Sequence, residues 1–215
     1  MGYADVMRRV EGAATRSGRS SEDITVVVVS KGRTVDAIRR VYDQGHRDFA
    51  ENRAQELAEK APHLPGDIRW HFVGPLQTNK VRIVRPGVIL LHSYDRDDLG
   101  RAWMKGPGSA PPVLLQVNIG REGQKHGFDP DDAEAGLVRA LQLGLDVIGL
   151  MAIPPLTEDS EGARPYFREL ASIRDGLVSR HPSVWELSMG MTDDFEVAIE
   201  EGATIIRPGR AIFES

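Results

Sequence analysis

The stretch Ile24-Thr-Val-Val-Val-Val-Ser30, followed directly by Lys31, decides the fold class. Four consecutive valines are typical of a strand that is buried on both faces, as strands are in a parallel sheet covered by helices. A lysine at the end of such a strand has its amine near apolar surroundings and near the end of the sheet where ligands bind. The other reading of Lys31 is a solvated residue that opens a loop.

Strand-like and helix-like segments alternate along the rest of the chain. Thr34 can cap the first helix, whose apolar residues fall on one face, and Gly45 ends it. The predicted strands are residues 24–30, 46–51, 69–74, 88–93, 113–119, 145–153, 184–188 and 204–207. The helices between them are predicted at 34–45, 53–61, 78–84, 97–104, 130–143, 161–180 and 193–201.

This alternation predicts a parallel sheet, because parallel strands need a crossover connection that is usually a helix. Eight strands are the number that closes a barrel. Little chain follows the last strand, so residues 4–17, with Val6 and Val10 on one face, could supply the missing outer helix. We therefore predict an α/β fold, a single (β/α)8 TIM barrel, in one domain over residues 1–215. An open doubly wound sheet is the alternative, because strand order cannot be read from the pattern.

Composition excludes several classes of protein. The chain has 215 residues, 40% of them hydrophobic and 27% charged, which is ordinary for a globular domain. The net charge of −5 argues against nucleic acid as a partner. The chain has no cysteine, and its histidines show no metal-ligand spacing, so we expect no metal site. We find no signal peptide and no membrane-spanning stretch, and expect a cytoplasmic protein.

Residues at the carboxyl ends of the strands are the site candidates, because that end of a barrel carries the active site. They include Lys31, Asn52 and His71 after or within the first three strands. The loops after the last two strands, where such barrels often bind phosphate, contribute Ser188, Gly190, Arg207 and Gly209. The glycines could instead serve only as turn residues, and Arg207 could pair with a carboxylate.

An amine and a phosphate site in one barrel mouth indicate two kinds of ligand. Pyridoxal 5′-phosphate (PLP) would join Lys31 through its aldehyde while the far loops hold its phosphate. A sugar-phosphate enzyme with a Schiff-base lysine would show similar elements. The residues alone do not separate these two.

Six sequence blocks together resemble the pyridoxal 5′-phosphate homeostasis protein family, over residues 24–213. They are Val29-Ser-Lys31, Phe49-Ala-Glu-Asn52, Trp70-His-Phe-Val-Gly-Pro-Leu-Gln-Thr-Asn-Lys80, Gly149-Leu-Met-Ala-Ile153, Leu187-Ser-Met-Gly-Met-Thr-Asp-Asp194 and Arg207-Pro-Gly-Arg-Ala-Ile-Phe213. The third block, Trp-His-Phe-x-Gly-x-Leu-Gln-x-Asn-Lys, and the Leu-Ser-Met-Gly-Met run are long and specific. The resemblance implies an alanine-racemase-like barrel that binds PLP.

The resemblance also implies roles for individual residues. Lys31 matches the lysine that forms the aldimine with PLP, and Ser188, Gly190, Arg207 and Gly209 match phosphate-binding elements. Asn52 and His71 match polar positions at the cofactor mouth. Lys125 matches a second lysine, which could receive or pass on the cofactor. Two departures affect the phosphate loop: Pro208 removes a backbone N–H, and Arg210 adds a charge.

The resemblance implies a monomeric carrier that holds PLP for intracellular homeostasis and supplies it to apo-enzymes. The alternative is a PLP-dependent racemase or decarboxylase. Racemisation needs two bases on opposite faces of the substrate carbon, and Lys31 supplies one. Tyr94 is the one tyrosine near the carboxyl end of a predicted strand, where a core or rim role is more common. We therefore expect a carrier and not an enzyme.

Overall fold

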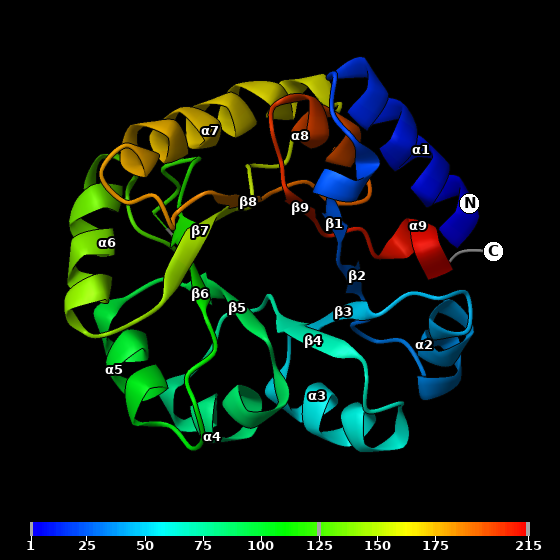
Figure 1. Ribbon diagram of the computed structural model, residues 1–215, viewed down its shortest axis with the longest axis horizontal. Helices are drawn as coiled ribbons and strands as arrows, with labels where there is room; N and C mark the ends of the chain where they lie inside the picture. Colours follow the sequence, from blue (N-terminus) through cyan, green and yellow to red (C-terminus); the bar gives the residue numbers. More distant parts are fainter. Residues whose placement is uncertain (1, 124–125, 214–215) are drawn as a thin grey trace.

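The computed structural model describes residues 2–123 and 126–213. Its strands are β1 (Thr25–Val26), β2 (Val28–Val29), β3 (Asp48–Glu51), β4 (Arg69–Phe72), β5 (Leu90–Tyr94), β6 (Val113–Val117), β7 (Val147–Ala152), β8 (Glu186–Ser188) and β9 (Ile205–Ile206). The helices are α1 (Tyr3–Arg16), α2 (Val35–Tyr42), α3 (Ala54–Lys60), α4 (Val81–Val84), α5 (Asp97–Lys105), α6 (Ala133–Gln142), α7 (Arg164–Val178), α8 (Phe195–Glu200) and α9 (Arg210–Phe213). Figure 1 shows the strands in the centre and the helices around them.

The parallel sheet closes into a barrel through the valine run. β1 pairs with β9, and β2 pairs with β3 at the other end of the strand order. Between β1 and β2, the Val27 N–H donates to the Ile206 carbonyl at 2.8 Å, so the two short strands are one interrupted strand. The prediction of an eight-stranded barrel is confirmed, and the open-sheet alternative is wrong.

Alternate valines of this strand face two different cores. Val26 and Val28 belong to the large core between the strands and the helices. Val27 belongs to a smaller core inside the barrel, together with residues such as Ala50 and Leu114. The run is apolar throughout because successive strand residues point to opposite faces and both faces are covered.

Helix α1 completes the outer ring of helices, as the sequence predicted for residues 4–17. Its buried face consists of Val6, Val10, Ala13 and Ala14. Figure 1 shows α1 beside α8 and α9, and the Arg9 guanidinium lies 2.6 Å from the Glu196 carboxylate of α8. One detail differs from the prediction, since the one-turn helix α9 follows the last strand.

Two further expectations bear on the residues that the structure describes. In residues 2–123 and 126–213, no helix combines the length and the apolar character needed to cross a membrane. Within the same ranges, no group of three or more histidine, aspartate or glutamate side chains is arranged to hold a metal ion.

Candidate functional site

A cavity of about 420 Å³ lies at the carboxyl ends of the strands. Four of the seven predicted site residues line it together: Lys31, Asn52, Arg207 and Gly209. Thr192 and Arg210 also line it, from the loops after β8 and β9. These segments are far apart in the sequence, and the closed barrel brings their ends to one mouth.

The backbone on both sides of Lys31 is held by hydrogen bonds. On one side, the buried Ser30 hydroxyl lies 2.7 Å from Glu51 Oε1, and Lys60 Nζ donates to the Ser30 carbonyl at 3.0 Å. On the other side, the Gly32 N–H donates to Glu56 Oε2 at 2.8 Å, and Gly32 has a φ of +68° that favours glycine. Lys31 itself is exposed at the mouth, which differs from the apolar surroundings that the sequence suggested.

Lys60 organises the acidic residues beneath this loop, and sequence reasoning missed it. Its ammonium lies 2.7 Å from Glu51 Oε1 and 2.7 Å from Glu56 Oε2. Burial raises the pKa of Glu51 in spite of Lys60, whereas the hydrogen bond from Lys60 lowers the pKa of the more exposed Glu56. The available signal was the spacing of Glu56 and Lys60, which are neighbours on one helix face.

Asn52 offers an unused hydrogen-bond acceptor in this region. Its side-chain oxygen is buried and has no hydrogen-bond partner among the described residues. The backbone of Asn52 is fixed by close contact with Gly74, where an added Cβ would lie 2.1 Å from the Asn52 carbonyl oxygen. A buried acceptor without a partner is costly, so a ligand that donates to Asn52 would remove that cost.

Arg207 supplies a buried positive charge to the cavity. The residue is only 4% exposed, and its two terminal nitrogens donate to Ser188 Oγ at 2.6 Å and to the Ala152 carbonyl at 2.9 Å. Burial lowers the pKa of Arg207 to about 10, with Asp194 acting in the opposite direction. The guanidinium is therefore charged at neutral pH.

The loops after β8 and β9 meet through polar contacts at the same cavity. The Gly209 N–H donates to Thr192 Oγ1 at 3.2 Å, and Arg210 forms an ion pair with Asp193. Pro208 takes part in the barrel through its carbonyl, which accepts the Val29 N–H at 2.9 Å. Pro208 therefore lacks a backbone N–H to donate, but it contributes to the barrel as a hydrogen-bond acceptor.

Three of the predicted site residues do not line this cavity. Ser188 is fully buried below it, and its hydroxyl contacts Arg207 and His92. Gly190 packs against α8, since an added Cβ would lie 2.6 Å from the Ala198 methyl group, and its φ is +90°. His71 is 3% exposed and points into the barrel interior. The predicted Lys125 lies outside the described residues, and Tyr94 is fully buried in the core.

His71 and Ser188 belong to a buried hydrogen-bond chain through the barrel, together with Asp48, His92 and Arg207. His71 Nε2 lies 3.3 Å from Asp48 Oδ1, and His71 Nδ1 lies 3.0 Å from His92 Nε2. His92 Nδ1 lies 2.8 Å from Ser188 Oγ, which accepts from Arg207. The chain thus connects the first residue of β3, at the amino end of the barrel, to the cavity at the carboxyl end.

The partners at the two ends of this chain fix the direction of the hydrogen bonds there. Asp48 forms a salt bridge with Arg69, and hydrogen bonds from Arg69 and His71 outweigh burial and hold its pKa well below the usual range. Its carboxylate can only accept, so the hydrogen bond between the two residues is donated by His71 Nε2. At the other end of the chain, Ser188 Oγ accepts from the Arg207 guanidinium.

His92 is a functional candidate that the sequence did not reveal. It lies within a strand, between apolar and small residues, and gives no motif of its own. Burial lowers the pKa of His92 well below its usual value, and the charges of His71 and Arg207 lower it further. Only the closed barrel brings it next to Ser188, which is 96 residues away in the chain.

Comparison with known proteins shows the family of this chain. The family described as "Alanine racemase, N-terminal domain" matches residues 8–215. The chain is 41% identical over 214 residues to the pyridoxal phosphate homeostasis protein of Aquifex aeolicus, covering 97% of this chain and 94% of that protein. The same protein of Escherichia coli (strain K12) is 40% identical over 222 residues, with 98% and 93% covered.

A solved structure shows the same fold with a ligand. It is that of PipY from Synechococcus elongatus with PLP bound, which has a TM-score of 0.79 and 33% sequence identity. The match covers 95% of this chain and 99% of PipY. The sequence identity over nearly the whole chain, the match to the family model and the shared barrel all point to one family. The chain therefore belongs to the pyridoxal phosphate homeostasis protein family, which shares the fold of the alanine racemase N-terminal domain.

Proposed function

We propose that the protein is an intracellular PLP carrier whose single domain, residues 1–215, binds the cofactor in the cavity at the barrel mouth. The observation that carries this proposal is that the Lys31 amine and the buried Arg207 guanidinium line the same cavity of about 420 Å³. That volume is in the range of small-molecule sites. PLP supplies an aldehyde that condenses with a primary amine and releases water.

Each residue at the mouth has a role that its contacts support. Lys31 provides the amine, and its backbone is held in place by the Ser30 and Gly32 hydrogen bonds. Asn52 provides an acceptor that has no other described partner. Arg207 places a positive charge beside the cavity, where it favours an anionic ligand.

We assign the phosphate group to the two loops that meet beside Arg207. The Thr192 hydroxyl, the Gly209 N–H and the Arg210 guanidinium all belong to residues that line the cavity there. Asp193 opposes an anion at this place, but its charge is paired with Arg210. We assign Ser188, Gly190 and His71 to the support of this site, because Ser188 holds Arg207, Gly190 admits α8 and His71 holds His92.

We infer a carrier and not a racemase or decarboxylase. A second acid–base group would have to reach the substrate from the cavity wall. Tyr94 is buried in the core, where burial raises its pKa to about 12, so it does not serve. The carboxylate that lines the cavity, Asp193, is engaged by Arg210. The partners we propose are apo-enzymes that need PLP, reached by a monomer in the cytoplasm.

The cofactor site is tested by an absorbance titration with PLP, followed by borohydride reduction and peptide mass mapping. We expect a new absorbance band near the edge of the visible range, as for an aldimine between PLP and lysine, and a reduced adduct on Lys31. Lys31→Ala should lose both, whereas Lys105→Ala, which removes another exposed lysine, should keep them. An adduct spread over surface lysines, or an unchanged band in Lys31→Ala, would refute the assignment.

Transfer assays separate carrier from enzyme. The loaded protein is mixed with a PLP-dependent apo-enzyme, and recovery of that enzyme's activity is compared with recovery from an equal amount of free PLP. Racemisation and decarboxylation of a panel of amino acids are measured with the same sample. Recovery without amino-acid turnover supports the carrier, and turnover that disappears in Lys31→Ala supports the enzyme.

A further inference from the structure

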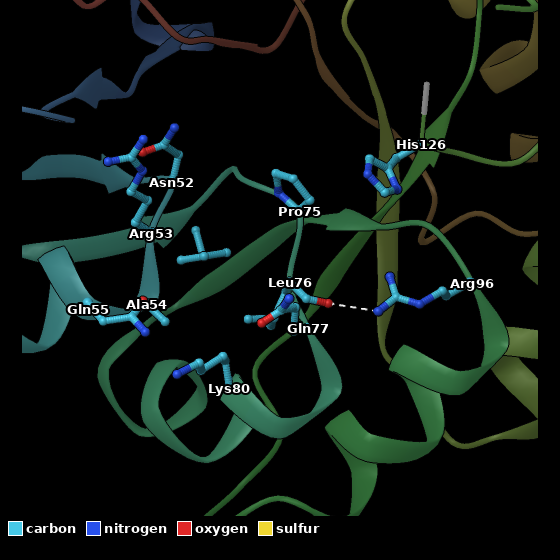
Figure 2. A pocket seen from close by; sticks show the side chains of 11 residues that line it. Asn52, Arg53, Ala54, Gln55, Pro75, Leu76, Gln77, Lys80, Arg96 and His126 are labelled. Atoms are coloured by element: carbon cyan, nitrogen blue, oxygen red, sulfur yellow. Dashed lines mark hydrogen bonds between the residues drawn. The ribbon is translucent and has the colours of Figure 1, made fainter. Parts of the chain in front are cut away.

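A second cavity, of about 400 Å³, lies next to the proposed cofactor cavity. The two cavities share Asn52 and Pro75 as lining residues. Figure 2 shows the second cavity between the start of α3, the loop after β4 and Arg96. Its wall includes Leu76, Gln77 and Lys80, the end of the specific sequence block at residues 70–80, and these three residues do not line the cofactor cavity.

Positive charge dominates the wall of this second cavity. Arg53, Lys80 and Arg96 line it, and the described lining residues include no aspartate or glutamate. Polar groups of Gln55 and Gln77 face the same space. A cavity with three cations and amide groups is suited to an anion.

Neighbouring carboxylates balance only part of this charge. Arg96 lies 2.6 Å from Asp95, and its other terminal nitrogen donates to the Leu76 carbonyl at 2.9 Å, the bond drawn in Figure 2. His126 shares the same Asp95 carboxylate at 3.1 Å. Arg53 is 3.7 Å from Glu56, which Lys60 already binds at 2.7 Å.

Lys80 is the lining cation that takes no part in these contacts. Within residues 2–123 and 126–213, no ion pair or side-chain hydrogen bond involves its ammonium group. The residue is half-buried and lines the cavity, and in Figure 2 its ammonium end points toward the start of α3. An ammonium at the wall of a cavity binds an anionic oxygen with less solvent screening than a fully exposed one.

We propose that this second cavity binds a small organic anion, whose carboxylate or phosphate group is held by Lys80 with Arg53 and Arg96. The apolar side chains of Phe72 and Leu76 suit the carbon part of such a ligand. Because Asn52 and Pro75 line both cavities, an occupant of the second cavity contacts residues that also meet the cofactor. The site goes beyond the proposed function and does not require PLP.

Backbone amide NMR shifts, recorded during titration with inorganic phosphate or with acetate, test the proposal. Sodium chloride at matched ionic strength is the reference. We expect saturable shifts at residues 52–55 and 76–80 with at least one of the two anions, in the free and in the PLP-saturated protein. Shifts confined to residues 191–210 would locate the anion in the cofactor cavity instead and would overturn the proposal.

Variants of Lys80 complete the test. Lys80→Met keeps the length of the side chain and should weaken the binding at residues 76–80 at least about tenfold, the loss expected for a charged hydrogen bond. Lys105→Ala removes a lysine from α5 and should leave that binding unchanged. Thermal unfolding checks that both variants fold. Equal affinity in folded Lys80→Met, or no shift beyond that caused by chloride, would refute the second site.

Discussion

His92 Nδ1 lies 2.8 Å from Ser188 Oγ inside the barrel, and this contact joins β5 to β8 directly below the cavity. Ser188 Oγ accepts a hydrogen bond from the Arg207 guanidinium at 2.6 Å. His92 does not line the cavity, but through Ser188 it helps to position this charge. His92 in turn contacts His71, and His71 contacts Asp48. Hydrogen bonds thus link Arg207 to residues at the opposite end of the barrel.

Ser188→Ala should weaken PLP binding while the protein stays folded. The substitution removes the acceptor of Arg207 and leaves a buried donor unpaired, which costs about 1–3 kcal/mol. When that cost falls on the bound state, the dissociation constant rises about 5- to 150-fold. An absorbance titration with PLP measures it, and Ser17→Ala at the end of α1 is the matched control. Unchanged affinity in Ser188→Ala would show that Ala152 alone holds Arg207.

Stability should fall as the pH drops from about 7 to 5, and His92 should be a main cause. Burial keeps its pKa well below the ordinary value of 6.5, so the folded protein does not take up the proton that the unfolded chain binds. Unfolding therefore becomes easier below pH 6.5. The pKa of buried His46 is lowered in the same direction.

Urea unfolding of the protein and of His92→Gln at pH 8, 7, 6 and 5 measures this effect. The variant should be less stable at pH 8, because it loses hydrogen bonds, but its stability should decline less toward pH 5. His46 remains in both proteins, so only the difference between the two slopes reports on His92. Parallel curves would contradict the role of His92, because they would mean that it takes up its proton over the same pH range in the folded and the unfolded protein.

The barrel could be predicted from the sequence because its strongest signals are local. Val26, Val27 and Val28 predict a strand that is buried on both faces. In the structure all three are buried, with Val26 and Val28 in the outer core and Val27 inside the barrel. The apolar face of α1 was visible as a spacing of Val6 and Val10. Closure itself needed the structure, because pairing between residues 26 and 206 is not a property of either segment.

The site was less predictable than the fold, because side-chain direction depends on register. A shift of one residue moves a strand side chain to the other face. Ser188 ends β8 and could have faced the mouth, but it faces the interior and His92. The role of Lys60 could not be predicted for another reason. Its partner Glu51 lies in a different element, and the sequence pattern does not show that the two side chains meet.

Gly74→Ala should damage both cavities at once. An added Cβ would lie 2.1 Å from the Asn52 carbonyl oxygen, which forces the segments after β3 and β4 apart. We expect a loss of about 2 kcal/mol or more in the free energy of unfolding and weaker PLP binding. Gly66→Ala is the matched control, because an added Cβ there meets nothing within 4 Å. Equal stability of the two variants would mean that the Asn52 segment moves freely.

Lys60→Met should destabilise the protein and should do so more strongly at pH 7 than at pH 4.5. The variant leaves the Glu51 carboxyl, with a fully buried side chain, without its cation, which costs about 3 kcal/mol. Burial already raises the pKa of Glu51, and removal of Lys60 raises it further. Above its usual pKa of 4.5 the unfolded chain releases a proton that folded Glu51 retains, so stability falls as the pH rises.

The double variant Lys60→Met with Glu51→Gln should recover much of this loss at pH 7, because a neutral amide needs no cation. Urea unfolding at pH 4.5 and 7 compares the three proteins, and the PLP titration follows the Lys31 loop in parallel. A deficit in Lys60→Met that is the same at both pH values would contradict the assigned role of Glu51. Such a result would mean that Lys60 acts mainly through its hydrogen bond to the Ser30 carbonyl, next to Lys31.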